Sequence, residues 1–121
     1  MPPSETTQQD QLFGSIKIGG NAVLSAPETF THEQAPAFAE ALEVLCSQKQ
    51  TSVVLDCKKT AFMDSVALEH IIDAHNQLRA LGGVFKIVSL NSVCRDILVV
   101  TRLVNVLNVY SDVPDALRSR T

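Results

Sequence analysis

Short aliphatic runs alternate with amphipathic stretches in the second half of the chain, and this alternation limits the possible folds more than any other feature. Ser52–Asp56 and Val84–Ser89 are apolar runs, typical of strands covered on both faces. Between them, apolar residues recur every three or four positions, which predicts a helix from near Asp64 or Ser65 to Gly82-Gly83. A strand, a helix and a strand in this order predict a right-handed crossover between parallel strands.

The same alternation continues to the end of the chain. Asn91 or Ser92 is expected to cap a third helix, and Leu107–Tyr110 reads as an edge strand. Asp112, with a proline two residues later, opens a short final helix. The side chains expected to face the core are Leu68, Ile71, Ile72, His75 and Leu78 in the second helix, Val93, Ile97 and Leu98 in the third, and Ala116 and Leu117 in the last.

The first half adds a hairpin and a helix. Gly19-Gly20 lies between two short segments, Phe13–Ile18 and Asn21–Ser25, and is a strong signal for an antiparallel turn. A helical face follows at Ala35, Phe38, Ala39, Leu42, Leu45 and Cys46. Its start stays open, because Thr31 with Gln34 resembles a capping box while Pro36 fits better in the first turn. The predicted fold is α/β: a mixed β-sheet with helices packed on it, opening with a β-hairpin.

Composition indicates one domain without a charged binding surface. The 121 residues suffice for a single core, which we assign to residues 12–121, after a polar tail at 1–11 that we expect to be disordered. A net charge of −3 argues against nucleic acid and anionic membrane as partners. No apolar run could span a bilayer and the start does not resemble a signal peptide, so we expect a cytoplasmic protein with reduced cysteines. The oligomeric state stays open.

A search for catalytic and metal-binding patterns yields little. His70 and His75 are five residues apart on one predicted helix and point to different faces, so no metal site is expected. Cys57 and Asp56 follow a buried strand, where a cysteine phosphatase or a receiver domain places its reactive group, but the accompanying arginine, acidic pair and lysine are missing. We therefore predict no enzyme and no cofactor, with a Cys57- or Asp56-based enzyme as the less favoured alternative.

The informative segment is Phe62–Leu68. Phe62 and Met63 are expected to anchor a loop in the core, and Ser65 to present its hydroxyl outward at the start of a helix, where a kinase could reach it. The simpler interpretation is that Asp64 and Ser65 only cap that helix.

Three segments are similar to the STAS family, the sulfate-transporter and anti-sigma-factor-antagonist domains. They are Val53–Asp56 followed by Phe62–Leu68, Leu78–Val88 with its double glycine, and Val93–Leu103 with Val109, Tyr110 and Asp115–Leu117. The resemblance covers Val53 to Leu117. Val66 and Ala67 stand where the family commonly has Ser or Thr and then Gly.

The resemblance implies an anti-sigma factor antagonist or a related bacterial partner-switching protein. In that family the serine after the aspartate is phosphorylated by a kinase that is also the anti-sigma factor, so the matching phosphoacceptor is Ser65. The implied partner-binding residues are Asp64, Ser65, Val66, Ala67 and Leu68, which bind the anti-sigma factor while the serine is unphosphorylated. The alternative within the same fold is a non-phosphorylated scaffold or a transporter-associated subunit.

Overall fold

Five strands form one mixed sheet at the centre of the molecule. A computed structural model describes residues 13–119, and the predicted tail at 1–11 lies outside them. The sheet has the order β1-β2-β4-β6-β7, in which β1 and β2 are antiparallel and every other pair is parallel. The strands are Gly14–Ile18, Asn21–Ser25, Ser52–Asp56, Val84–Val88 and Asn108–Tyr110. The predicted hairpin, the central position of β4 and the edge position of the last strand are confirmed.

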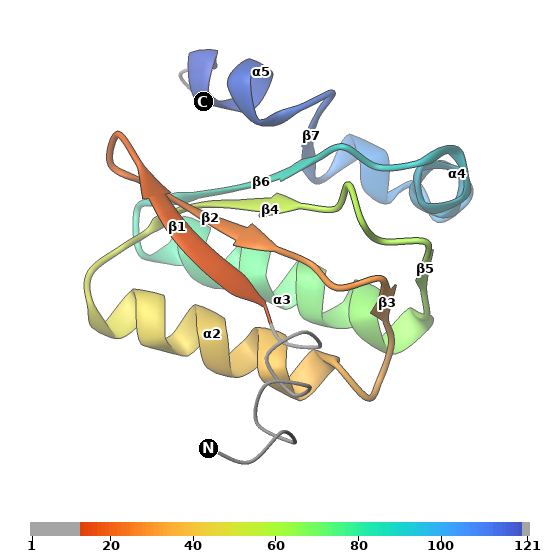
Figure 1. Cartoon of the computed structure of the whole chain (residues 1–121), viewed down its shortest axis with the longest axis horizontal. Coiled ribbons are helices and arrows are strands. Elements are labelled where there is room, and N and C mark those ends of the chain that lie inside the picture. The colour runs from red at the N-terminus through yellow and green to blue at the C-terminus, as the bar shows by residue number, and fades with distance from the viewer. Residues whose placement is uncertain (1–12, 120–121) are drawn as a thin grey trace, which may run out of the picture.

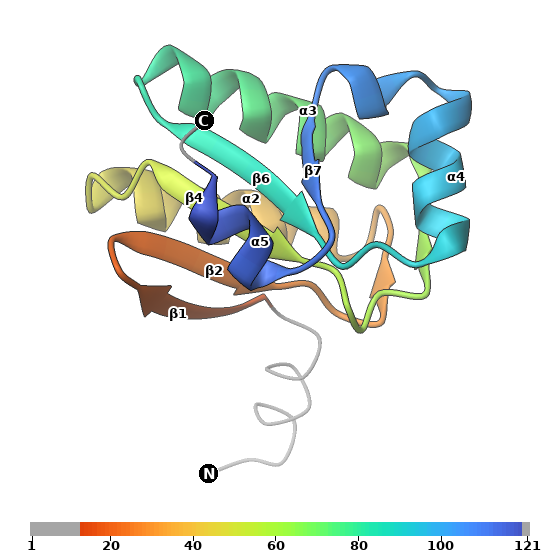
Figure 2. The same ribbon diagram turned by 90° about the horizontal axis from the view of Figure 1, so that it is seen from above.

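Helices cover both faces of this sheet. Helices α2 (Ala35–Ser47) and α3 (Ser65–Ala80) pack side by side on one face, and the short α5 (Val113–Arg118) lies on the other (Figures 1 and 2). Helix α4 (Ser92–Val100) and the 3-10 turn η1 (Leu103–Asn105) connect β6 to β7. The predicted α/β fold class is confirmed.

A second, very small sheet was not predicted. Strands β3 (Thr29–Phe30) and β5 (Phe62–Met63) pair in parallel beyond the ends of β2 and β4. Each has only two residues, too few for the period-two alternation that marks a strand in sequence. This pair brings the loop before α3 next to the loop before α2.

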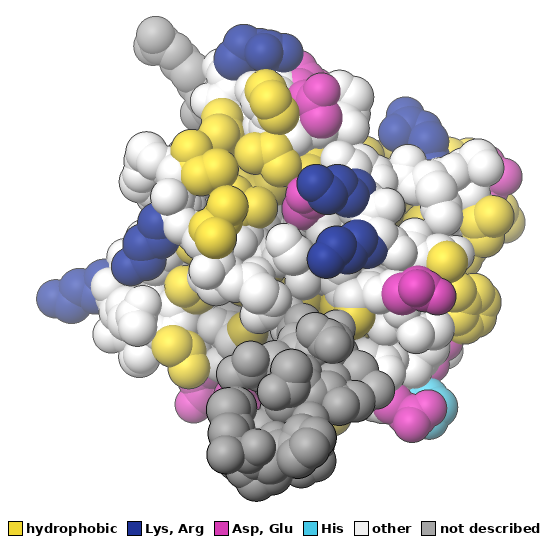
Figure 3. All heavy atoms as spheres, in the orientation of Figure 1, with side chains coloured by type: hydrophobic (Ala, Val, Ile, Leu, Met, Phe, Trp, Pro, Cys, Tyr) yellow, Lys and Arg dark blue, Asp and Glu magenta, His cyan; other side chains and the backbone are white. Residues whose placement is uncertain are grey.

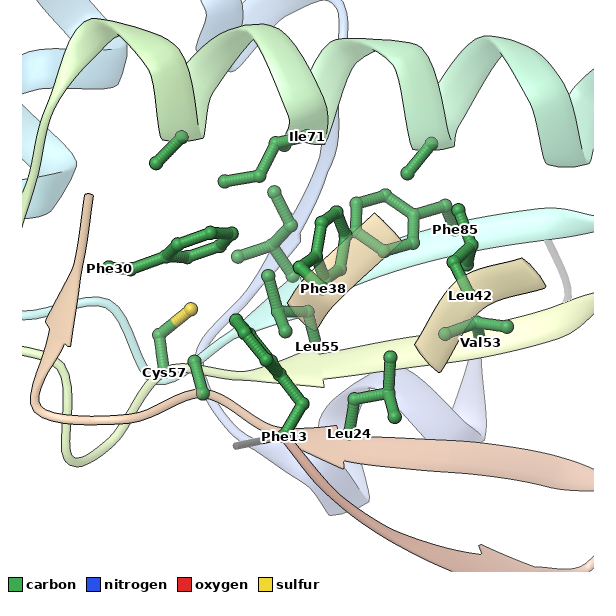
Figure 4. Packing of buried hydrophobic residues seen from close by; sticks show 14 of the residues in the cluster. Phe13, Leu24, Phe30, Phe38, Leu42, Val53, Leu55, Cys57, Ile71 and Phe85 are labelled. Carbon is green, nitrogen blue, oxygen red and sulfur yellow. The ribbon is translucent and has the colours of Figure 1, made fainter. Parts of the chain in front are cut away.

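The main core lies between the sheet and the helices α2 and α3, and four phenylalanines fill it. The ring centroids of Phe13 and Phe30 are 4.9 Å apart, and Phe38 lies 5.3 Å from each of them. Phe38 also contacts Phe85 of β6 at 6.2 Å (Figure 4). Such tilted and edge-on ring pairs add about 0.5–1.5 kcal/mol each beyond the burial of their area.

Two helices start at the predicted cap residues, and a third start has features of both predicted alternatives. Asn91 caps α4 and Asp112 caps α5 through their side chains. At the first helix, Thr31 N donates to Gln34 Oε1 at 3.0 Å, which is one half of a capping box, but the helix itself begins at Ala35 with Pro36 in its first turn.

Three expected core positions are wrong. Ala39 and Val93 are exposed, Val93 by 53%, because each lies at the margin of the buried face of its helix. Phe62 is 47% exposed, while Met63 is buried as predicted. These two residues form β5, and successive side chains of a strand point to opposite sides.

Two glycines end α3, each for a different reason. Gly82 has a φ of +80°, a left-handed conformation that glycine adopts without a steric penalty. A Cβ on Gly83 would lie 2.1 Å from the carbonyl oxygen of Thr51, so only glycine lets the two backbones approach at this point. The double glycine is therefore both a helix end, as predicted, and a packing contact.

A buried lysine holds α5 on the opposite face of the sheet. Lys86 of β6 is 4% exposed, and its Nζ donates to the carbonyl oxygens of Ala116 at 2.8 Å and Ser119 at 3.0 Å. The same ammonium lies 5.4 Å from the ring centroid of Tyr110. Around it, Val23, Val54, Val88 and Ala116 form a second apolar cluster.

Candidate functional site

The segment singled out in the sequence lies where β5 leads into α3. Asp64 is the N-cap residue of this helix: its Oδ1 accepts a hydrogen bond from the backbone N of Ala67 at 2.9 Å. Its own backbone N donates to the carbonyl oxygen of Phe30 at 3.3 Å, which continues the β3–β5 pairing. Of the two predicted cap residues, Asp64 takes this role and leaves Ser65 as the first residue of the helix.

The other oxygen of Asp64 binds a residue from a distant part of the chain. Both the backbone N and the Nδ1 of His32 contact Asp64 Oδ2, at 2.9 and 3.2 Å. His32 lies in the turn between β3 and α2, so this contact joins two loops that are 32 residues apart. Nothing local in the sequence marks His32, because its role depends on the β3–β5 pairing.

The Asp64 carboxylate is stabilised in its charged form. Partial desolvation raises its pKa, but this effect is outweighed by hydrogen bonds from the backbones of Ala67 and His32 and by the His32 ring, so the pKa is lowered overall. A negative charge therefore lies beside Ser65 at neutral pH.

The predicted partner-binding residues divide into an exposed and a buried group. Ser65 is exposed and Val66 is half-buried at the surface. Ala67 and Leu68 are only 0% and 8% exposed, because they lie on the face of α3 that packs on the sheet. We correct the expectation for these two residues: they support the segment from below and do not face a partner.

Exposed apolar side chains lie near Ser65. Phe62 precedes Ser65 by three residues, and α4 packs beside β5 and carries the exposed Val93 in its first turn. We use the name Phe62 surface for Phe62 and Val66, which lie on either side of Ser65 in the chain. The exposure of Phe62 could not be inferred from sequence, because a bulky aromatic residue before a helix reads as an anchor.

The alternative reactive residues have structural surroundings. Cys57 is 1% exposed, and burial, then the neighbouring Cys94 and Asp56, raise the pKa of its thiol well above the usual range. A thiol held in the neutral form is a poor nucleophile. Asp56 Oδ1 accepts a hydrogen bond from the backbone N of Lys58 at 3.1 Å, the contact of a turn-forming aspartate.

Neither a metal cluster nor a membrane-spanning helix is found within residues 13–119. No three side chains of His, Cys, Asp or Glu converge there, and none of the helices in this range has the length and apolar character needed to cross a bilayer. His32, His70 and His75 lie apart: His32 contacts Asp64, His70 Nδ1 lies 3.0 Å from the carbonyl oxygen of Val66, and His75 is buried in the second half of α3.

Comparison with known proteins identifies relatives of this fold. No curated protein sequence matches the chain. A putative anti-sigma factor antagonist from Thermotoga maritima has a TM-score of 0.81 and 20% identity, over 91% of this chain and 95% of its own. An anti-sigma factor antagonist from Mycobacterium paratuberculosis has a TM-score of 0.79 and 22% identity, over 87% and 89%.

A third similar structure is a Bacillus cell fate determinant in its phosphorylated form, with a TM-score of 0.68 and 14% identity, over 87% of this chain and 96% of that one. At these identities the structures support the fold. The sequence profile of the STAS domain matches residues 15–116, from the first strand to the last helix. The chain therefore belongs to the STAS domain family.

Proposed function

We propose that this protein is an anti-sigma factor antagonist, or a related partner-switching protein of bacteria, that binds an anti-sigma factor through the start of α3 while Ser65 is unphosphorylated. The observation that supports it best is the exposure of Ser65 as the first residue of α3, directly after a cap residue whose two carboxylate oxygens are both engaged. The hydroxyl is thus accessible on a well-anchored turn. We assign the switch to the cytoplasm, where ATP for the kinase is available.

The docking area that we propose contains Ser65 and the Phe62 surface. An apolar area next to a neutral hydroxyl suits a partner that buries both, since desolvating a hydroxyl costs far less than desolvating a charge. Asp64, Ala67 and Leu68 hold the shape of this area from behind.

Phosphorylation would reverse this match. A phosphoserine adds about −1.5 to −2 charges at neutral pH, beside the ionised Asp64. Burying that charge against the Phe62 surface would cost the partner several kcal/mol in desolvation and repulsion. The domain itself tolerates the change, because an anion at a helix N-terminus is stabilised by about 0.3–1 kcal/mol.

The experiment is capture of binding proteins from native lysate with and without ATP, followed by intact-mass measurement of the bait. The wild type should gain one phosphate and release its partner when ATP is present. Ser65→Ala should stay bound and unmodified, and Ser65→Asp should bind at least about tenfold more weakly.

The chain offers a matched control in Asn91-Ser92-Val93, which repeats the pattern of Asp64-Ser65-Val66 at the start of α4. Asn91 caps that helix with a 2.8 Å hydrogen bond from Cys94 N, and Ser92 is exposed. Ser92→Ala should behave like the wild type. If wild type and Ser65→Ala gain phosphate equally, or if Ser65→Asp binds as tightly as wild type, the switch is wrong and a non-phosphorylated scaffold or transporter-associated subunit takes its place.

A further inference from the structure

A cavity of about 320 Å³ lies at the far end of α3 from Ser65. Its walls come from the last turns of α3, the start of β6, the segment before β7 and the first residue of β7, and include His75, Arg79, Gly83, Phe85, Val106 and Asn108. At about 1.5 Å of rise per residue, Arg79 is roughly 21 Å along the helix from Ser65. We call this space the His75 cavity.

His75 brings an unusual feature to this cavity. Its side chain is buried, with 7% of the residue exposed, and its Nδ1 is the one buried side-chain nitrogen or oxygen within residues 13–119 that has no hydrogen-bond partner. If the proton were on Nδ1, the ring would bury an N–H without a partner, which costs more than burying a lone pair without one. The other ring nitrogen, Nε2, is not enclosed in this way. The ring therefore favours the tautomer with its proton on Nε2, which makes it a hydrogen-bond donor toward the cavity.

Arg79 adds a positive charge one helical turn later. Its guanidinium makes no ion pair or side-chain hydrogen bond with any residue in the described range. A basic residue at a helix end often compensates the last carbonyl groups. Here the carbonyl oxygens of Gln77, Leu78 and Arg79 already accept backbone hydrogen bonds from Leu81, Gly82 and Gly83, so the five N–H groups of Arg79 stay available.

The remaining walls favour a small molecule with an apolar part. Val106, which is 53% exposed, contributes apolar surface, whereas Phe85 is 1% exposed and its ring packs on Phe38 in the main core. Asn108 Nδ2 donates to the carbonyl oxygen of Phe85 at 3.2 Å, which fixes this side chain in the cavity wall. None of the lining side chains is a carboxylate.

We propose that the His75 cavity binds a small organic carboxylate. The carboxylate accepts hydrogen bonds from His75 Nε2 and the Arg79 guanidinium, and the body of the ligand packs on Val106. An Arg–carboxylate pair is a strong, directional contact, and a space of this size suits a ligand of about ten non-hydrogen atoms. This site does not depend on the switch at Ser65, and no binding partner is needed to test it.

The experiment is a two-dimensional amide NMR titration of the full chain with sodium benzoate, at constant ionic strength. Benzamide serves as the neutral probe of the same shape, and inorganic phosphate as the anion without an apolar body. Benzoate should shift the amides of Gly83, Val84 and Asn108 together with the His75 ring signals, with a Kd of about 1–10 mM.

Substitutions at an exposed position test the contact without risk to the core. Arg79→Gln should weaken the binding of benzoate at least about tenfold, since it removes a charge-assisted contact. Arg79→Lys should restore part of the affinity. Arg95→Gln, which changes an exposed arginine on α4, should leave the affinity unchanged. His75→Phe, checked by its melting temperature, should also weaken binding. The proposal is overturned if benzoate causes no localised shift up to about 20 mM, if benzamide or phosphate binds equally well, or if Arg79→Gln binds like Arg95→Gln.

Discussion

At the scale of single residues, Asp64 stabilises two separate segments of the backbone. One oxygen of its carboxylate caps α3 and the other holds the turn at His32. Asp64, the residue next to the proposed phosphoacceptor, therefore fixes two loops. The hydrogen bonds through which it does so also keep its carboxylate ionised.

Replacing Asp64 by Ala should lower the free energy of unfolding by about 1 kcal/mol, within the usual 0.5–2 kcal/mol for a lost N-cap. Urea denaturation at neutral pH measures this change. Asp112→Ala, which removes the cap of the short α5, is the comparison, because that side chain accepts from Asp115 N and has no histidine partner.

The same carboxylate predicts a pH dependence. Because the pKa of Asp64 is lowered in the folded state, its stabilising effect is present above the pKa of the unfolded chain and is lost as pH falls through the folded value. Asp64→Asn should keep part of the cap and lose this dependence. Equal loss of stability on acidification in wild type and Asp64→Asn would contradict the assignment.

Sequence alone located Asp64 and Ser65, because a cap residue before an apolar periodicity is a local pattern. It could not locate His32, since the contact needs two loops brought together by two-residue strands. It also predicts Phe62 to be buried, which is wrong, because the orientation of a two-residue strand decides which of Phe62 and Met63 faces the core.

At the scale of elements, the α3–β6 junction depends on two adjacent glycines. Gly83→Ala should destabilise the protein by about 1–3 kcal/mol, because its Cβ would meet the Thr51 backbone. Gly82→Ala should cost about 1–2 kcal/mol, from the left-handed backbone alone, since nothing lies within 4 Å of its Cβ. Denaturation curves of the two variants measure this. A smaller loss for Gly83→Ala than for Gly82→Ala would show that the Thr51 contact relaxes easily.

Helix α5 is held on the sheet by the hydrogen bonds of Lys86 and by the second apolar cluster. Lys86→Met removes two hydrogen bonds to Ala116 and Ser119 but also a buried charge, so the change in overall stability should stay below about 2 kcal/mol. Hydrogen exchange should show the local effect: faster exchange at Ala116–Ser119 with little change in α3. If exchange in α5 is unaltered, the apolar cluster alone holds this helix.

Most elements follow from periodicity and capping residues, and the confirmed order of strands and helices reflects this. The exceptions are β3 and β5, whose pairing is tertiary, and the burial of Lys86. Sequence gave no reason to expect a charged side chain in a strand core, because its partners belong to the end of the chain.

At the scale of the whole molecule, removal of residues 1–11 should leave the melting temperature within about 5 °C of the full chain. A polar segment without apolar residues beyond Met1 buries too little surface to offset the entropy of ordering it, about 1–2 kcal/mol per residue. Thermal denaturation of both chains measures this. A larger drop would mean that the segment belongs to the domain.

The position of β1 at the edge of the sheet has a consequence for colloidal behaviour. All five of its residues are exposed, and Ile16, at 60%, shares a face with Val23 beside α5 (Figure 3 shows apolar side chains gathered between the hairpin and α5). An edge strand with unpaired backbone groups and an exposed apolar side chain is a template for sheet-to-sheet aggregation. Ile16→Lys should therefore delay the onset of light scattering in concentrated, stirred solution while changing the free energy of unfolding by no more than about 0.5 kcal/mol. Unchanged scattering would mean that aggregation of this protein in storage starts from another part of its surface.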